Sequence, residues 1–443
     1  MRVMKWSMIA LAVAAAASTQ MASAAPFVSD QAEAKGFVED ASAKLLLRNY
    51  YFNRDRKDGS TDQKDWTQGI WGNFNSGYTQ GTVGVGIDAF GYLAVKLDGG
   101  DGTRGTGNMS VDGDGDVNDS QGKAGAAVKF RVSKTELKIG DQQPSTAPVF
   151  AVGGSRVLPQ TASGFQLQSS EIKDLDLEAG HFYSATSQDR NARDGGLFAT
   201  YAGVEANSID YAGGKYSFTD NLSASVYGAQ LEDIWNQYYG NLNYTIPMGG
   251  DQSLNLDGNI YRTTDTGSAK AGDISNTAYS LAAAFSFLKA HTVTLAFQKI
   301  NGDTPFDYIG VGKNNRGGDS IFLANSIQYS DFNAPNEKSA QIRYDLKMAE
   351  YGVPGLSFMT RYVKGWDIDG SKVDATSPYA ALGYGDNGKH NETNFEAKYV
   401  VQSGPAKDLS FRIRQAWHYA NADETEGDVK EFRLIVDYPI SVL

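Results

Sequence analysis

Apolar and polar residues alternate with a period of two in many segments of this chain. In residues 254–262, Leu254, Leu256 and Ile260 fall on one face, and the residues between them are mostly polar. The same alternation recurs in residues 82–89, 291–298, 341–348 and 432–442. Successive side chains of a β-strand point to opposite faces, so the pattern predicts strands with one apolar face and one wet face.

Two all-β architectures use such strands. A soluble sandwich points the apolar face inward, whereas a transmembrane barrel points it at lipid and encloses a polar lumen. Here the wet faces are rich in charged and amide side chains, and aromatic residues stand near expected strand ends, at 49–51, 237–239 and 417–419. Aromatic residues form girdles at both interfaces of a bilayer. The pattern therefore favours an all-β fold, a transmembrane antiparallel β-barrel, whose closure pairs every backbone polar group.

The expected connections between strands are of two kinds. Residues 353–355 and 403–406 suit tight turns, whereas the long Gly/Asp-rich segments suit external or pore-folded loops: 98–123, 150–161, 301–318 and 367–391. With roughly 10 residues per strand and about a dozen per connection, the chain provides about 16 to 20 strands. A barrel of that width encloses an aqueous lumen, which loops must narrow.

The first 24 residues follow a different pattern. Arg2 and Lys5 precede an unbroken apolar run at residues 8–17, and residues 22 and 24 are both alanine. This is the layout of a secretory signal peptide, and its apolar run is too short to span a bilayer. We expect cleavage after Ala24, which gives a signal peptide at residues 1–24 and a barrel at residues 25–443. The mature chain would have 419 residues and a net charge of −14.

Composition excludes several classes of protein. The chain has no cysteine, which rules out a disulfide framework and thiol chemistry. Its net charge of −12 argues against a nucleic-acid partner, because phosphate binding needs clustered basic residues. The acidic segment from Asp112 begins like a calcium loop, but Val117 stands at the glycine position and Lys123 at the glutamate position. The sequence therefore predicts no metal site and no cofactor.

Six longer stretches resemble the OprD-type substrate-specific outer-membrane porins: GFVED at residues 36–40, LLLRNYYFNRD at 45–55, DWTQG at 65–69, DNLSAS at 220–225, GGDSIFLANS at 317–326 and DLSFRIRQAWH at 408–418. The resemblance implies a barrel of 18 strands, a third external loop that folds inward to constrict the pore, and a location in the bacterial outer membrane. It also implies passive, partly selective diffusion of small charged solutes, namely basic amino acids, short peptides and carbapenem-type antibiotics. The protein would be a monomer or a loosely associated trimer.

Alternation places several basic side chains in the lumen. In residues 409–419 most odd positions are apolar, so Arg412 and Arg414 face inward, and the same reasoning sends Lys398, Arg433 and Arg343 inward. The wrong face would put an arginine in lipid at a cost of about 2 to 4 kcal/mol at the bilayer midplane. A column of guanidinium groups offers bidentate sites that can pass a carboxylate from one group to the next.

The resemblance adds residues that alternation does not reach. It implies that Arg156 is the basic residue of the inward loop. It also implies an acidic pocket that faces the arginines and consists of Asp319, Ser320 and Asp331. Tyr329 and Tyr201 would form the polar aromatic edges of this pocket. A basic amino acid would then present its carboxylate to the arginines and its side-chain cation to the aspartates.

Two alternatives remain open. Descriptions of OprD-type porins sometimes attach a serine-peptidase label, and the matching residues here would be His181, Asp233 and Ser320. These residues lie far apart in the sequence, no nucleophile elbow surrounds Ser320, and a triad is recognised by its geometry. The other alternative is a carboxylate-preferring porin of the same family.

Overall fold

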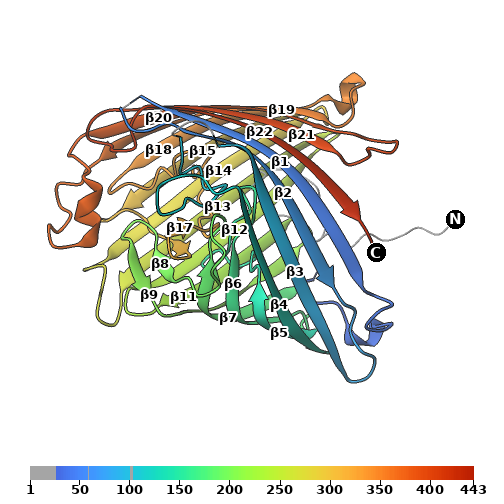
Figure 1. Cartoon of the computed structure of the whole chain (residues 1–443). Helices are drawn as coiled ribbons and strands as arrows, with labels where there is room; N and C mark the ends of the chain where they lie inside the picture. The colour runs from blue at the N-terminus through green and yellow to red at the C-terminus, as the bar shows by residue number, and fades with distance from the viewer. Residues whose placement is uncertain (1–25, 58, 100–102) are drawn as a thin grey trace.

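The computed structural model describes residues 26–57, 59–99 and 103–443, and its main sheet is an antiparallel barrel of 18 strands (Figure 1). β22 pairs with β1, which closes the sheet and confirms the expected fold. The signal peptide expected at residues 1–24 and its cleavage site lie outside the described residues. The wall strands are β1 Ser42–Arg56, β2 Gln63–Asn75, β3 Val83–Asp98, β4 Ser120–Val132, β5 Thr135–Gln142, β6 Thr161–Ser169, β7 Leu175–Thr186, β10 Ile209–Thr219, β11 Leu222–Leu231, β12 Trp235–Gly249, β13 Gln252–Asp265, β14 Ser275–Phe287, β15 His291–Asn301, β18 Lys338–Lys347, β19 Leu356–Ile368, β20 Gly388–Val400, β21 Ser410–Ala420 and β22 Val429–Ser441.

A second, small sheet joins two of the loops. It consists of β8 Leu197–Ala199, β9 Val204–Ala206, β16 Ile309–Val311 and β17 Arg316–Gly317. Three single helical turns complete the described elements: η1 Gln31–Glu33, η2 Met348–Tyr351 and η3 Pro378–Leu382. Within the described ranges, no helix combines the length and the apolar character needed to cross a bilayer.

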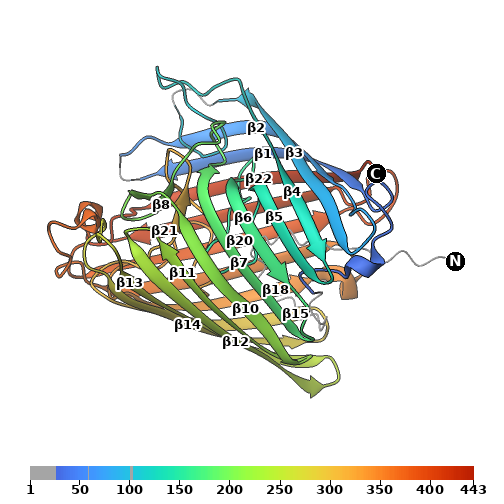
Figure 2. The ribbon, with the colours of Figure 1, turned by 90° about the horizontal axis from the view of Figure 1, so that it is seen from below.

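The two ends of the barrel carry different connections. At the end that holds the C-terminus and the first described residues, short turns join the strands, as at residues 133–134, 220–221 and 288–290 (Figures 1 and 2). The opposite end carries the long loops, among them residues 99–119, 143–160, 302–337 and 369–387. The two expected tight turns lie at the terminal end and the four expected long connections at the loop end, so both expectations are confirmed.

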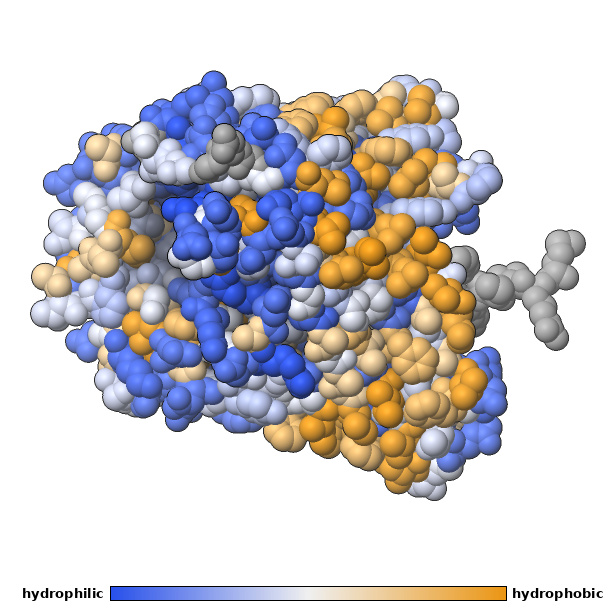
Figure 3. All heavy atoms as spheres, viewed as in Figure 1, coloured by the Kyte–Doolittle hydropathy of each residue, from blue (hydrophilic) through white to orange (hydrophobic). Residues whose placement is uncertain are grey.

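The two faces of the wall follow the alternation in the sequence. On β3, Val83, Val85 and Ile87 are exposed on the outer face, whereas the inward-facing Asn259 and Tyr261 of β13 are buried. In Figure 3, hydrophobic residues gather on the half of the visible surface nearer the termini, and hydrophilic residues cover much of the loop half. The predicted arrangement of apolar residues outside and polar residues inside is thus confirmed.

The expected aromatic girdle is only partly correct. Tyr238 is 56% exposed on the outer face, but its neighbour Tyr239 is 5% exposed and Tyr50 is fully buried. Because neighbouring residues of a strand point to opposite faces, one member of each Tyr–Tyr pair must turn toward the interior. Tyr50 and Tyr239 therefore belong to the core inside the barrel and not to the girdle.

Two external loops fold into the barrel. The inward loop (residues 143–160) joins β5 to β6 and is the third external loop, and its Phe150 packs against Phe182 of β7 at 4.7 Å between ring centroids. The long loop (residues 302–337) joins β15 to β18, and its Phe306 lies 4.8 Å from Tyr261 of β13. The hydrophobic core thus lies inside the barrel, between the wall and these loops, as expected for an inward third loop.

Candidate functional site: the lumen

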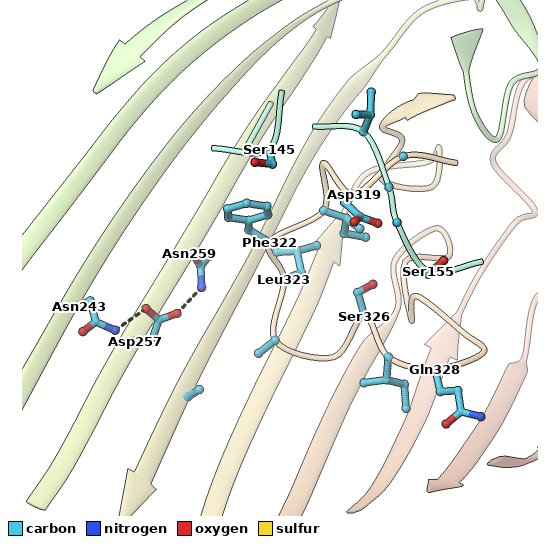
Figure 4. A pocket seen from close by; sticks show the side chains of 18 of the residues that line it. Ser145, Ser155, Asn243, Asp257, Asn259, Asp319, Phe322, Leu323, Ser326 and Gln328 are labelled. Carbon is cyan, nitrogen blue, oxygen red and sulfur yellow. Dashed lines mark hydrogen bonds between the residues drawn. The ribbon is translucent and has the colours of Figure 1, made fainter. Parts of the chain in front are cut away.

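A cavity of about 1730 Å³ lies inside the barrel, lined by wall strands, the inward loop and the long loop. Figure 4 shows Asp319 of the long loop close to the inward loop, and Asp257 between Asn243 and Asn259 on neighbouring strands. Polar groups thus converge on the cavity from the wall and from both loops.

The inward loop is fixed to the wall by its main chain. Arg48 Nη1 of β1 donates to the carbonyls of Gly154 at 2.8 Å and Arg156 at 2.9 Å. Trp71 Nε1 of β2 donates to the carbonyl of Val157 at 2.6 Å. Backbone carbonyls buried in a protein need such donors. These bonds therefore position Arg156 at the edge of the cavity.

One side of the lumen is rich in arginine. Arg412 Nη2 and Arg414 Nε, on β21, lie 2.7 Å and 3.2 Å from the same oxygen of Glu396 on β20. Two guanidinium groups share one carboxylate, so this part of the wall keeps a net positive charge. The arginines that line the cavity are Arg54, Arg156, Arg343, Arg361, Arg412, Arg414 and Arg433.

A second carboxylate is shared in the same way. Glu431 of β22 accepts from Arg433 at 2.5 Å and from Arg54 of β1 at 2.5 Å. Within the described residues, no carboxylate pairs with Arg156, whose Nε donates to the Thr106 carbonyl at 2.9 Å. Burial, and next the neighbouring Arg433, lower the pKa of Arg156 to about 10, so its guanidinium stays charged at neutral pH.

Two aspartates of the long loop line the same cavity. The side chain of Asp319 is exposed to the lumen. Asp331 is half-buried and accepts hydrogen bonds from Tyr201 Oη at 2.8 Å, Tyr308 Oη at 2.9 Å and Ser326 Oγ at 2.5 Å. Asp319 is therefore accessible from the cavity, whereas Asp331 also ties the loop together.

Amide groups form a further part of the wall. Asp257 of β13 accepts from Asn243 Nδ2 of β12 at 2.8 Å and from Asn259 Nδ2 at 2.5 Å (Figure 4). Asn241 Nδ2 also donates to Asp257, at 3.0 Å. These short polar side chains form a network that gives the lumen a wet surface away from the arginines.

Comparison with known proteins identifies the family. The model of the outer membrane porins of the OprD family matches residues 35–442. The chain belongs to this OprD family. It is 67% identical to Porin D of Pseudomonas aeruginosa over 446 residues, which covers 100% of both chains. The crystal structure of P. aeruginosa OprD matches with a TM-score of 0.84 and 63% identity over 95% of this chain and 100% of that chain. P. aeruginosa OpdK matches with a TM-score of 0.82 and 34% identity over 92% of this chain and 100% of the other.

As an OprD-family porin, the protein is an outer-membrane channel, and the lumen is its permeation path. Most residues predicted for that path line the cavity: Arg156, Arg412, Arg414, Arg433, Asp319, Asp331 and Tyr329. Lys398 lies opposite Arg412 in the register of β20 and β21 but is not among the lining residues. Tyr201 is likewise absent from the lining and contacts Asp331, and Ser320 is fully buried.

The three residues matched to a peptidase triad are not brought together in this porin. His181 Nδ1 lies 2.7 Å from Asp210, and its ring contacts the exposed Tyr183 on the outer face. Asp233, between β11 and β12, accepts from the backbone of Ser268 at 3.1 Å. Ser320 is buried in the long loop inside the barrel. A histidine on the outer face cannot activate a serine buried in the lumen.

Sequence reasoning missed two of the cavity arginines. Alternation did not reveal Arg361, because Met359 and Val363 on the same face are also apolar, and only the structure shows that its neighbour Tyr362 faces outward with 42% of its surface exposed. Arg54 was hidden because β1 contains apolar residues at three successive positions, 45–47, which obscures the two faces. A buried cluster of four further residues was also missed, because it depends on how β20 pairs with β21 and on where the last loop folds: His390, His418, Glu424 and Glu426.

Proposed function

We propose that this channel favours small solutes that carry both a carboxylate and a cationic group, namely basic amino acids and short peptides, and that it admits carbapenem-type antibiotics. The observation that supports this is the presence of partly neutralised arginines and the exposed Asp319 on one cavity. The carboxylate of such a solute would contact the arginines, and its cationic group would contact Asp319, in the constricted part of the path.

The arginines suit transit better than tight binding. Glu431 accepts hydrogen bonds from Arg54 and Arg433, whereas Glu396 accepts one from Arg412 and forms an ion pair with Arg414, so each carboxylate occupies only part of the donor capacity of its arginines. A solute carboxylate can still accept the remaining N–H donors in a bidentate manner and then move to the next arginine. Conduction needs binding that is favourable enough for entry and weak enough for exit.

A preference for carboxylates alone is the second candidate. It is favoured by the excess of arginines over aspartates on the cavity and by the structure of the relative OpdK, which was solved with vanillate, a carboxylate. The two candidates differ in the role of Asp319, since only a solute with a cationic group gains from that aspartate.

We also propose a monomer or a loosely associated trimer, which chemical cross-linking of the outer-membrane protein would distinguish.

Asp319→Asn removes the charge and nearly preserves the shape. We expect arginine and lysine to lose a several-fold advantage over glutamine in liposome uptake, while small-ion conductance changes little. Asp303→Asn is the matched control, because Asp303 is exposed on the same loop outside the cavity. An equal change for charged and neutral amino acids would contradict the proposed role of Asp319.

Asp331→Asn completes the test. Because Asp331 accepts three hydroxyl hydrogen bonds, its replacement should loosen the long loop as well as remove charge. The double variant of Asp319 and Asp331 should abolish the preference for basic amino acids, and the Asp331 variant alone should also alter conductance for all solutes. If both single variants behave alike, the aspartates only brace the loop, and the carboxylate-preferring channel becomes the better description.

A further inference from the structure

Two histidines and two glutamates, three of them buried, form a cluster that is separate from the cavity arginines. None of these four residues lines the cavity. The cluster consists of His390 on β20, His418 on β21, and Glu424 and Glu426 in the last external loop, residues 421–428. One ligand atom from each residue lies within 4.8 Å of all the others. We propose that this cluster binds one divalent transition-metal ion of the Zn²⁺ type.

The outer nitrogens of both imidazoles face hydrogen-bond acceptors. His390 Nε2 lies 2.7 Å from Glu337 Oε1, and His418 Nδ1 lies 2.8 Å from the Gly427 carbonyl. A carbonyl cannot donate, so His418 carries its proton on Nδ1, and a neutral His390 beside a carboxylate carries its proton on Nε2. The inner nitrogens, His390 Nδ1 and His418 Nε2, then present lone pairs to each other at 2.9 Å.

The two glutamates add acceptors to the same point. Glu424 Oε1 lies 3.5 Å from His390 Nδ1, and Glu426 Oε2 lies 3.5 Å from His418 Nε2 and 3.9 Å from His390 Nδ1. Within the described residues, Glu426 Oε2 is buried and has no hydrogen-bond partner. With His390 neutral and both glutamates ionised, four acceptors converge on one point, an arrangement that a cation would stabilise.

The spacing fits a tetrahedral transition-metal site. Zinc–nitrogen and zinc–carboxylate bonds of about 2.0 to 2.2 Å imply ligand–ligand separations of about 3.3 to 3.6 Å in a tetrahedron. The separations recorded around His390 Nδ1 and His418 Nε2 run from 2.9 to 3.9 Å. Imidazole suits zinc, copper and nickel, whereas calcium and magnesium prefer oxygen ligands alone. Glu337 and the Gly427 carbonyl would orient the imidazoles as outer-shell partners do in metal sites.

A shared proton is the competing occupant. A second proton on His390 could bridge to His418 Nε2 and would also match the 2.9 Å separation. That proton would satisfy one edge of the cluster, whereas a metal ion would contact all four ligand atoms, including the unpartnered Glu426 Oε2. Direct metal binding distinguishes the two occupants.

The cluster connects the last external loop to the long loop of the lumen. Glu337 ends the long loop, and Tyr329 Oη donates to the Glu426 carbonyl at 3.1 Å. The rings of Phe332 and Tyr329 lie 4.2 Å from His390 and 4.9 Å from His418. Asp331 lies between these two aromatic residues, so an ion in the cluster would stabilise the segment that carries an acidic group of the pore.

The test uses untagged, full-length mature protein in detergent, stripped with a chelator and passed through a desalting column. We expect titration calorimetry with Zn²⁺ to give one equivalent per chain, and Co²⁺ loading to give the visible absorption of a tetrahedral site. His390→Gln with His418→Gln should abolish both signals. The chain has four histidines, so His181→Gln with His291→Gln is the matched control and should retain them.

Loss of folding must be separated from loss of the site. Retention of the heat-modifiable band in gel electrophoresis shows that the barrel is intact, and Glu426→Gln gives a milder variant that should weaken Zn²⁺ binding at least tenfold. Metal loading should also raise the thermal unfolding temperature of the parent protein but not of the double histidine variant. Absence of stoichiometric binding by the parent protein, or its persistence in the folded double histidine variant, would overturn the proposal.

Discussion

Single side chains in this lumen act in shared groups. Glu396 pairs with Arg412 and Arg414, and Glu431 pairs with Arg54 and Arg433. Alternation along a strand predicted which way Arg412, Arg414 and Arg433 point, because the pleat fixes the face of each residue. It could not predict how these groups share carboxylates, since that depends on which residues of different strands and loops come together.

Replacing Arg412 and Arg414 with alanine tests the arginine column. The double variant removes two positive charges and leaves Glu396 unpaired beside the path. We expect liposome uptake of amino acids with a free carboxylate to fall several-fold. Adding Glu396→Gln controls for the exposed carboxylate: if this triple variant regains full uptake, the loss came from Glu396 and not from missing guanidinium groups. Unchanged uptake in the double variant would show that both arginines are ordinary wall.

The charge of Asp319 should make selectivity depend on pH. Enclosure inside the barrel raises the pKa of Asp319 to about 6, so its carboxylate is present above that pH and neutral below it. The preference for lysine over glutamine should therefore be complete near neutral pH and decline as the pH falls through about 6. Uptake at several pH values measures this, and Asp319→Asn should show a low, flat profile. A preference that is constant from pH 7.5 to pH 5 would contradict the assignment.

At the scale of elements, the strands were far more predictable than the loops. A strand shows its two faces locally, and most wall strands here alternate clearly, as in residues 82–89 and 341–348. The inward loop and the long loop lack such a period, because their contacts are made with distant strands. Phe150, for example, packs on Phe182, and Phe306 packs on Tyr261. The sequence marked residues 150–161 only as an external or pore-folded loop, and that the third external loop folds inward was expected from family resemblance alone.

Arg48 is the side chain best placed to test how the inward loop is held. It donates to the Gly154 and Arg156 carbonyls and pairs with Asp437 at 2.8 Å and 3.0 Å. In Arg48→Ala we expect larger and noisier single-channel conductance, because the loop loses two anchors beside the cavity.

Two controls isolate the effect of the loop. Arg48→Ala with Asp437→Asn removes the unpaired carboxylate as well, and its conductance should still differ from that of the parent protein. Arg262→Ala removes an arginine that is exposed on the outer face and should leave conductance unchanged. If the Arg48 variant conducts like the parent, the inward loop is held without these bonds.

At the scale of the whole molecule, the two ends of the mature chain can be described: the last strand closes the barrel against the first, and signal-peptide cleavage is expected to set the first residue. The barrel closes between the first and last wall strands, and the backbone of Val442 donates to the Ala43 carbonyl at 2.8 Å. We predict that the mature protein begins at Ala25, because the small residues at 22 and 24 favour cleavage after Ala24. N-terminal sequencing or intact mass of the outer-membrane protein measures this, and a start at any other residue would contradict it.

The net charge of the molecule should not set its ion selectivity. The chain carries −12 overall, yet seven arginines line the cavity, so the path and the surface differ in charge. Charges on external loops are screened over a Debye length of about 8 Å at physiological ionic strength and about 3 Å at 1 M. Removing exposed loop charges should therefore change selectivity little, whereas removing Asp319 should change it much more.

A triple variant in which Asp112, Asp114 and Asp116 are all replaced with asparagine compares exposed loop charges with the charge of Asp319. All three are exposed in the loop between β3 and β4, and none lines the cavity. We expect the reversal potential of this triple variant in a salt gradient to match that of the parent within a few millivolts, although three negative charges are gone. Asp319→Asn removes one charge and should shift the reversal potential toward anion preference. A larger shift in the triple loop variant than in Asp319→Asn would mean that surface charge, and not the lumen wall, controls which ions enter.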